Sequence, residues 1–301
     1  GISETVCAGG VPLTLWALLR TIKNPNVRNS LLLGLSAGIC VLTSWYYGLF
    51  AALSSALIVS WYALRHSWLV DWKALIRWTS VALMVALGLV IGPFLSFQRS
   101  LSASDAIVTR DPEFVENSLL NHNITDVISL VNPTTVPSPD LFALYGEELI
   151  IVIYLGWIAL ALSAYGLWAT RPRQQVAMWF GLGLVFLIFS LGPYLNMGGD
   201  YIMFQGKKIP LPFLPLYKAF PIFDRISHPF RFVTVVSLSL SVLSAYGFRA
   251  LTRRAKSTVQ STLLIVLVIG VLLEVHWFSP AAIPIPASPA AIPQAYTEMR
   301  A

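Results

Sequence analysis

Three basic side chains that could bind a phosphate lie close together in the sequence, where an apolar helix is predicted to begin. Arg225 and His228 precede Pro229, and Arg231 follows it. Proline is favoured in the first turn of a helix, because its missing N–H group would have no partner there. Such a helix end attracts anions, and guanidinium groups bind phosphate oxygens. We expect a phosphate or pyrophosphate site; contact of these cations with lipid headgroups is the alternative.

Acidic side chains with possible chemistry are more dispersed. Glu4 lies at the mouth of the first apolar stretch, Asp126 lies in a long polar segment, and Glu147 precedes the fifth apolar stretch. A carboxylate can deprotonate a hydroxyl group, and several carboxylates can hold a divalent cation against a phosphate. An acid at a helix start also complements the helix dipole, so a purely structural role is open for each.

The elements that must position these groups are lipid-embedded helices. The sequence is 56% hydrophobic and 11% charged, with a mean hydropathy of +0.70, whereas soluble domains carry roughly 25% charged residues. The run from Leu31 to Leu64 contains no charged residue. A spanning helix needs about 20 apolar residues, so this run is too long for one span. We predict a break at Thr43 to Gly48, where polar and aromatic side chains suit an interfacial turn.

The predicted fold is all-α, a polytopic transmembrane bundle of about eight spans within a transmembrane domain of residues 1–279, followed by residues 280–301 as the start of an extracytoplasmic region. The expected spans are residues 5–19, 29–44, 47–64, 78–97, 148–169, 176–195, 230–249 and 260–278.

Charge placement predicts the sidedness of the bundle. Alternate connections carry twelve basic residues against one acid, Asp71, and these connections should be cytoplasmic. The basic residues are Arg20, Lys23, Arg28, Arg65, Lys73, Arg77, Arg171, Arg173, Arg249, Arg253, Arg254 and Lys256. Both ends of the chain are then extracytoplasmic. The net charge of +6 reflects this topology, and nucleic acid is excluded as a partner.

Two long connections lie on the opposite, extracytoplasmic side. They cover residues 98–147 and 196–229 and combine prolines, aromatic residues and charges. Long loops in compact proteins are usually functional or disordered, and this composition does not favour disorder. We therefore expect the chemistry on the extracytoplasmic face. Within the last span, Glu274 is an intramembrane acid, which is a candidate functional group; extension of its side chain to the nearby interface is the favoured alternative.

Several short patterns resemble bacterial members of the GT-C glycosyltransferase superfamily. They are the segments 154–157 (YLGW), 190–195 (SLGPYL), 209–212 (IPLP) and 228–232 (HPFRF), together with Glu4 and the aromatic turn 44–48 (SWYYG). The opening acid, span and aromatic turn are also similar to catalytic subunits of oligosaccharyltransferases.

This resemblance implies a membrane glycosyltransferase in the bacterial plasma membrane. It would transfer a sugar from a polyprenyl-phosphate-linked donor to a saccharide, lipid or protein acceptor. Arg225, His228 and Arg231 correspond to donor-phosphate-binding positions. Glu4 corresponds to a catalytic acid that could also bind a divalent cation, Mg or Mn. Candidate substrate-groove residues are Trp45, Tyr46, Tyr47, Asp126 and Glu147.

The sequence differs from the superfamily pattern in one respect, and two other functions are possible alternatives to a glycosyltransferase. In the superfamily the principal catalytic carboxylate precedes the part that this sequence matches, so we expect the chain to be an internal fragment, truncated at both ends. A transporter or flippase for lipid-linked saccharides is the first alternative. Transporters often show inverted repeats and charged groups at the membrane midplane, and neither is evident here. A non-catalytic assembly subunit is the other alternative.

Overall fold

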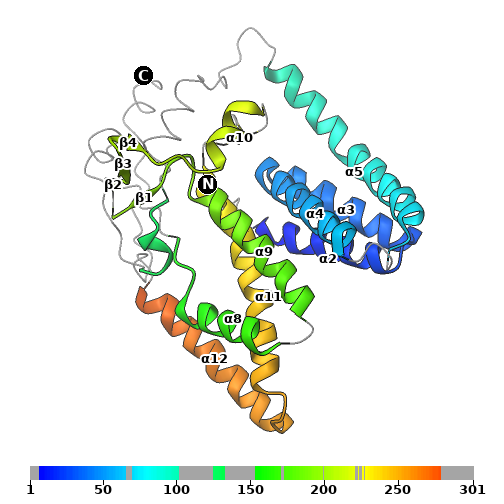
Figure 1. Cartoon of the computed structure of the whole chain (residues 1–301). Helices are drawn as coiled ribbons and strands as arrows, with labels where there is room; N and C mark the ends of the chain where they lie inside the picture. Colours follow the sequence, from blue (N-terminus) through cyan, green and yellow to red (C-terminus); the bar gives the residue numbers. More distant parts are fainter. Residues whose placement is uncertain are drawn as a thin grey trace, which may run out of the picture.

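The protein is mostly helical in the computed structural model, which describes residues 7–65, 70–101, 125–132, 153–170, 173–198, 200–220, 223, 226 and 228–278 (Figure 1). The α-helices in this part are α2 (Gly10–Lys23), α3 (Val27–Thr43), α4 (Trp45–Arg65), α5 (Trp72–Leu101), α8 (Trp157–Ala169), α9 (Arg173–Ser190), α10 (Phe213–Ala219), α11 (Val233–Leu251) and α12 (Ser257–Phe278). Short 3-10 helices are η1 (Cys7–Gly9), η4 (Ile128–Leu130) and η5 (Pro229–Phe232).

Four helical segments are long and apolar enough to cross a membrane: Trp45–Arg65, Trp72–Ser100, Pro229–Leu251 and Ser257–Trp277. Shorter apolar helices cover Val27–Thr43, Trp157–Ala169 and Gln174–Ser190. The predicted break in the long uncharged run is present but shorter than expected, because α3 ends at Thr43 and α4 begins at Trp45. Residues 45–48, expected in a turn, form the first turn of α4. The expected start of the fifth span is too early, since residues 153–156 are not helical and α8 begins at Trp157.

Helices α2 to α5 form one group, in which α3 packs closely against α5. Two glycines of α3 allow this close approach. A Cβ at Gly34 would lie 2.5 Å from the carbonyl oxygen of Ala82, and one at Gly38 would lie 2.8 Å from Leu89. The hydroxyl group of Ser30 donates a hydrogen bond to the carbonyl oxygen of Trp78. Small residues and interhelical hydrogen bonds are the usual basis of helix packing in lipid.

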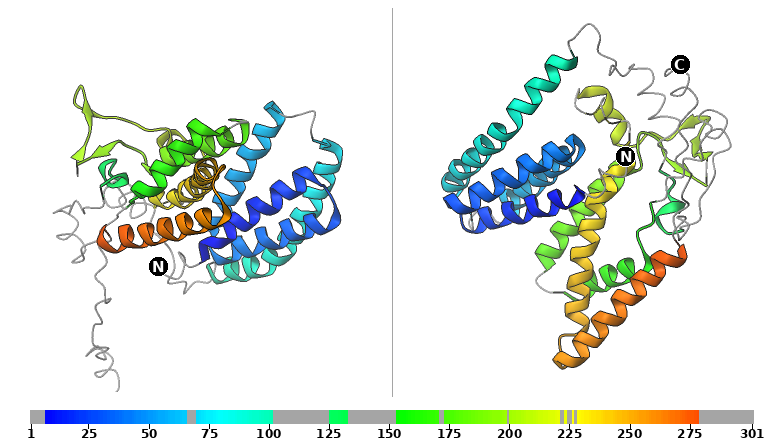
Figure 2. Two further views of the ribbon diagram at one scale, coloured as in Figure 1. Left: turned by 90° about the horizontal axis from the view of Figure 1, so that it is seen from below. Right: turned by 180° about the vertical axis from the view of Figure 1, so that it is seen from behind.

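Helices α8, α9, α11 and α12 form a second group, and its tightest contact is between α8 and α11 (Figures 1 and 2). A Cβ at Gly166 would lie 2.6 Å from the carbonyl oxygen of Leu243, and a Cβ at Gly247 would overlap the carbonyl oxygen of Leu162. Ser163 and Ser244 share a hydrogen bond of 3.0 Å at the same crossing. This helix pair therefore depends on small side chains along both helices.

An aromatic core joins the two helical groups. Phe50 of α4, Phe186 of α9 and Phe232 of η5 are fully buried. The ring centroids of Phe50 and Phe232 are 4.6 Å apart, and those of Phe186 and Phe232 are 5.6 Å apart. Phe213 of α10 packs on Phe232 from the other side, at 6.2 Å. Aromatic pairs at such distances contribute about 0.5–1.5 kcal/mol beyond the burial of their surface.

The connection between α9 and α11 contains two short antiparallel hairpins in addition to α10. Strand β1 (Asn196–Met197) pairs with β2 (Asp200–Tyr201), and β3 (Met203–Phe204) pairs with β4 (Lys207–Lys208). Figure 2 shows this strand region projecting beyond the end of α9. The segment expected as a long loop is thus largely ordered secondary structure in its described residues.

Candidate functional site at the C-terminal end of α9

Several of the sequence patterns meet where α9 ends. Gly192, with a φ of +79°, turns the chain after α9, and a Cβ there would lie 3.6 Å from Pro229. Thr125 donates a hydrogen bond of 2.6 Å to the carbonyl oxygen of Ser190. Leu211 donates one of 2.9 Å to the carbonyl oxygen of Pro193. Positive φ angles are readily adopted by glycine, so Gly192 suits this turn.

The basic residue Arg231 lies on the aromatic turn at the start of α4. Its guanidinium carbon is 4.6 Å from the centroid of the Tyr46 ring. Arg231 is half-buried and Tyr46 is buried. A cation over a ring at this distance is stabilised by the ring quadrupole. The structure therefore brings together one predicted phosphate-binding residue and one predicted groove residue from distant parts of the chain.

Of the other two predicted phosphate-binding residues, the structure describes His228 but not Arg225. His228 is half-buried at the start of η5, and its ring lies edge-on to Phe230 at 5.7 Å. Arg225 lies outside the described residues, as do Glu4 and Glu147. The structure places Arg231 in the 3-10 turn that leads into α11, where its backbone N–H group donates to the carbonyl oxygen of His228 at 3.1 Å.

The aromatic turn at the start of α4 has an exposed part and a buried part. Trp45 is 40% exposed, and its ring centroid lies 4.4 Å from that of Tyr46. Tyr47 is only 4% exposed and packs edge-on against Phe50. Trp45 is thus the exposed member of this segment, whereas Tyr46 and Tyr47 are both buried and pack against Phe50 of the aromatic core.

Asp126 occupies a structured turn rather than an open groove. It is 8% exposed, and its Oδ1 atom accepts a hydrogen bond of 2.7 Å from the backbone N–H group of Ile128. Its backbone forms a bridge with Asn196, and Val127 donates to the carbonyl oxygen of Asn196 at 3.1 Å. These contacts explain Asp126 as a residue that fixes this turn against β1.

The first hairpin carries a buried polar pair beside the site. Asn196 and Tyr201 are direct partners across the β1–β2 pair. Neither Nδ2 of Asn196 nor the Tyr201 hydroxyl group has a hydrogen-bond partner in the described part of the chain. Burial, and secondarily the neighbouring Tyr194, raises the pKa of Tyr201 to about 12. The ammonium group of Lys208 lies 3.7 Å from the centroid of the Tyr201 ring.

The intramembrane acid Glu274 caps a neighbouring helix. Its carboxylate accepts hydrogen bonds from the Tyr154 hydroxyl group and from the backbone N–H groups of Trp157 and Ile158, the last at 3.3 Å. Glu274 is 9% exposed, so its carboxylate is bound inside the protein, and its extension toward the membrane interface stays a prediction. Gly156, with a φ of +85°, lets the chain turn beside this carboxylate. Glu274 therefore replaces the missing helical acceptors at the start of α8.

No group of three His, Cys, Asp or Glu side chains that could hold a metal ion occurs among the described residues. The predicted metal ligand Glu4 lies outside them, so divalent-cation binding stays a prediction. Comparison with known proteins supplied no match of any kind: no family model, curated protein or solved structure is similar to this chain.

Proposed function

We propose that this protein is a membrane glycosyltransferase that takes its sugar from a polyprenyl-phosphate-linked donor on the extracytoplasmic side. The contact between Arg231 and Tyr46 carries this proposal. It places a permanent cation on an aromatic surface at the adjoining ends of two apolar helices, α4 and the η5–α11 segment. An anionic group attached to a lipid chain requires this combination of a positive charge and an apolar flank.

Phosphate binding is compatible with the geometry of Arg231. The guanidinium carbon lies 4.6 Å from the Tyr46 centroid, and a guanidinium group binds phosphate oxygens through its N–H donors. The contact with Tyr46 restricts the side chain before a ligand arrives, which lowers the entropic cost of binding. In the proposal, Arg225 supplies further positive charge to the same segment, and the His228 imidazole assists as a hydrogen-bonding group.

The proposed reaction is a displacement at the anomeric carbon of the donor sugar. A carboxylate, with Glu4 as the proposed residue, accepts the proton of an acceptor hydroxyl group. The acceptor oxygen then forms a bond to the anomeric carbon as the bond from that carbon to the phosphate oxygen breaks. Negative charge develops on the leaving polyprenyl phosphate, where Arg231 and Arg225 stabilise it.

The proposed topology has eight spans, with the basic connections in the cytoplasm and both ends of the chain outside. Four long apolar helices and the three shorter ones support membrane embedding. The proposed location is the bacterial plasma membrane.

The test is sugar turnover in membranes that contain the protein, with a polyprenyl-phosphate-linked sugar as donor. Arg231→Gln should lower turnover by at least ten-fold, and Arg231→Lys should recover only part of it, because an ammonium group cannot bind two oxygens in one plane. Arg249→Gln, at the opposite end of α11, is the matched control and should keep normal turnover. Equal turnover of all three variants would refute the phosphate role, and movement of the lipid without sugar transfer would indicate a flippase.

A further inference from the structure

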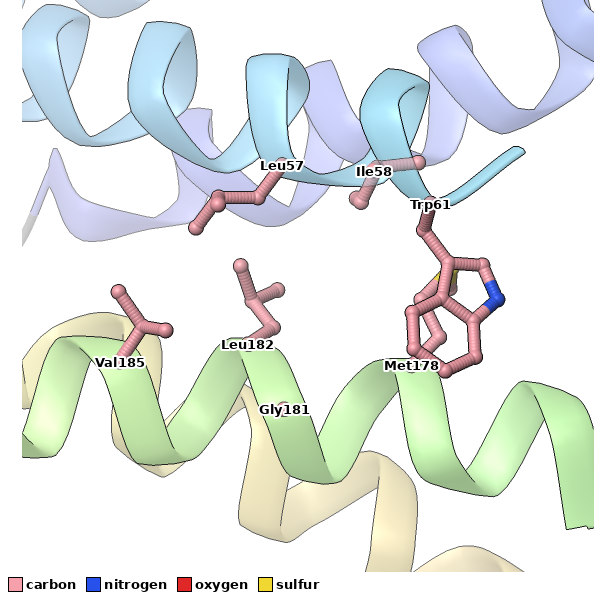
Figure 3. Close-up of a pocket in the computed structure, with 7 residues that line it drawn as sticks. All are labelled: Leu57, Ile58, Trp61, Met178, Gly181, Leu182 and Val185. Atoms are coloured by element: carbon pink, nitrogen blue, oxygen red, sulfur yellow. The ribbon is translucent and has the colours of Figure 1, made fainter. Parts of the chain in front are cut away.

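A narrow apolar slot lies between α4 and α9, below the aromatic core (Figure 3). Its volume is about 190 Å³. In Figure 3, side chains of the two helices face one another across an open space. The slot is lined by Leu57, Ile58, Trp61, Met178, Gly181, Leu182 and Val185. All of these residues are apolar apart from the indole N–H group of Trp61, so the slot suits a hydrocarbon chain.

The lining of the slot reaches the surface of the helix pair at one edge, because Leu57 is 37% exposed. Gly181 has no heavy atom within 4 Å of the position that its Cβ would occupy. Because Gly181 has no side chain, the slot is wider here than it would be with a larger residue. A chain dissolved in the membrane can therefore enter sideways between α4 and α9.

The depth of the slot argues for a long chain. Tyr46 and Leu57 are both on α4, and a helix rise of 1.5 Å per residue places Leu57 roughly 16 Å from Tyr46 along the helix axis. The hydrocarbon core is about 30 Å thick, so one leaflet is about 15 Å deep. A chain whose head lies at Arg231 must therefore pass the membrane midplane to fill the slot. An acyl chain of the same leaflet ends near the midplane.

The route from Arg231 to the slot follows the outside of the aromatic core. Phe50, Phe186 and Phe232 are each fully buried and contact one another, so they close the interior path between the two helical groups. The exposed side of α4 and α9 remains as the connection. A flexible carrier chain can follow that surface and then turn into the slot.

We infer that the α4–α9 slot binds the distal hydrocarbon tail of the polyprenyl carrier whose phosphate binds at Arg231. This inference rests on the proposed function, because that function supplies the identity of the lipid. It assigns two contacts to one ligand: a cation at the membrane surface and a shape-selective slot beyond the midplane. Affinity should then depend on the length of the prenyl chain.

The experiment uses photo-crosslinking with a polyprenyl phosphate that carries a diazirine near the end of its chain. Protein in native membranes is irradiated, and the labelled peptides are identified by mass spectrometry. Labelling is expected on the slot residues of α4 and α9. Gly181→Leu fills the slot and should reduce this labelling at least five-fold. Gly88→Leu is the control, because Gly88 of α5 also has no heavy atom within 4 Å of its Cβ position but does not line the slot.

Thermal unfolding of both variants shows whether a loss of labelling reflects misfolding, and equal unfolding temperatures are expected. A probe with a short prenyl chain should leave the slot unlabelled. Equal labelling by a diacyl phospholipid probe, or labelling that Gly181→Leu leaves unchanged, would overturn the inference. If the slot is unlabelled while Arg231→Gln still abolishes turnover, only the slot assignment fails. If the slot is labelled while turnover is independent of Arg231, the slot stands and the proposed function fails.

Discussion

The guanidinium group of Arg231 lies over the ring of Tyr46, with 4.6 Å between the guanidinium carbon and the ring centroid. This contact joins the start of the η5–α11 segment to the start of α4. Here a predicted phosphate-binding residue contacts a predicted groove residue. The strength of the contact can be measured without any knowledge of the substrate.

A double-mutant cycle with Arg231→Gln and Tyr46→Leu should give a coupling energy of about 1 kcal/mol in the free energy of unfolding. The partial burial of the pair supports a value above that of an exposed pair. Arg20 and Trp16 on α2 form the control, because their separation is a similar 4.8 Å but Trp16 is 47% exposed. Unfolding in detergent with increasing denaturant is the measurement. A coupling no larger than the control would show that the Arg231 contact does not stabilise the fold.

Replacement of Glu274 should destabilise the protein through the start of α8. Glu274→Leu removes the acceptor of three hydrogen bonds, at a cost of roughly 2–3 kcal/mol; the Trp157 N–H group keeps the Tyr154 hydroxyl oxygen as an acceptor at 3.2 Å. Glu274→Gln keeps one oxygen and should cost less. The neighbouring Val275 is 55% exposed, so Val275→Ala is the matched control. A loss for Glu274→Leu that equals the control loss would contradict the capping role.

Replacement of Gly247 by alanine should separate α8 from α11. The added methyl group would overlap the carbonyl oxygen of Leu162, and relief of such overpacking typically costs about 1–3 kcal/mol. The control is Gly88→Ala in α5, where the added methyl group meets open space. Alanine is the better helix former, so the control should be neutral or slightly stabilising. The free energies of unfolding of the two variants are compared under identical conditions.

Tyr201 should make the stability of the protein depend on alkaline pH. Its folded-state pKa is raised to about 12, above the ordinary value of 10.0. The protonated phenol is therefore favoured in the folded state. Its contribution to stability is complete below pH 10 and is lost as the pH rises toward 12.

Tyrosinate absorbance, measured against pH together with unfolding, tests this expectation. Tyr201→Phe should remove the alkaline loss of stability. Because the Tyr201 hydroxyl group has no hydrogen-bond partner in the described segments, the variant should be at least as stable as the parent protein at neutral pH. A large loss of stability in Tyr201→Phe at neutral pH would show that the hydroxyl group is hydrogen-bonded in solution.

The helical framework was predictable because it follows from local composition. Apolar stretches marked the main helices, and the polar residues near Ser44 marked the end of α3 and the start of α4. The burial of Cys40 agrees with its place in an apolar stretch. The two hairpins after α9 were missed, because each strand is only two residues long and carries no alternating pattern.

The candidate site was predictable only in part, because it depends on contacts between distant segments. The basic character of Arg231 and the aromatic turn at Tyr46 were visible separately, but nothing in their spacing indicated that they meet. Glu274 was recognised as unusual, yet its partners are backbone N–H groups, which carry no sequence signal. Glycine pairs such as Gly166 and Gly247 could have been noticed as small residues that face each other on apolar helices.

The cap on α8 also fixes an order of events during synthesis. Tyr154, Trp157 and Ile158 are made 116 to 120 residues before Glu274. Until the last helix has emerged from the ribosome and entered the bilayer, the start of α8 has no acceptor from this carboxylate. When Glu274 is inserted, the groups that donate hydrogen bonds to its carboxylate have already been synthesised. Completion of the bundle therefore depends on the arrival of α12, and a chain that stalls before this helix exposes an unfinished α8 to quality-control proteases.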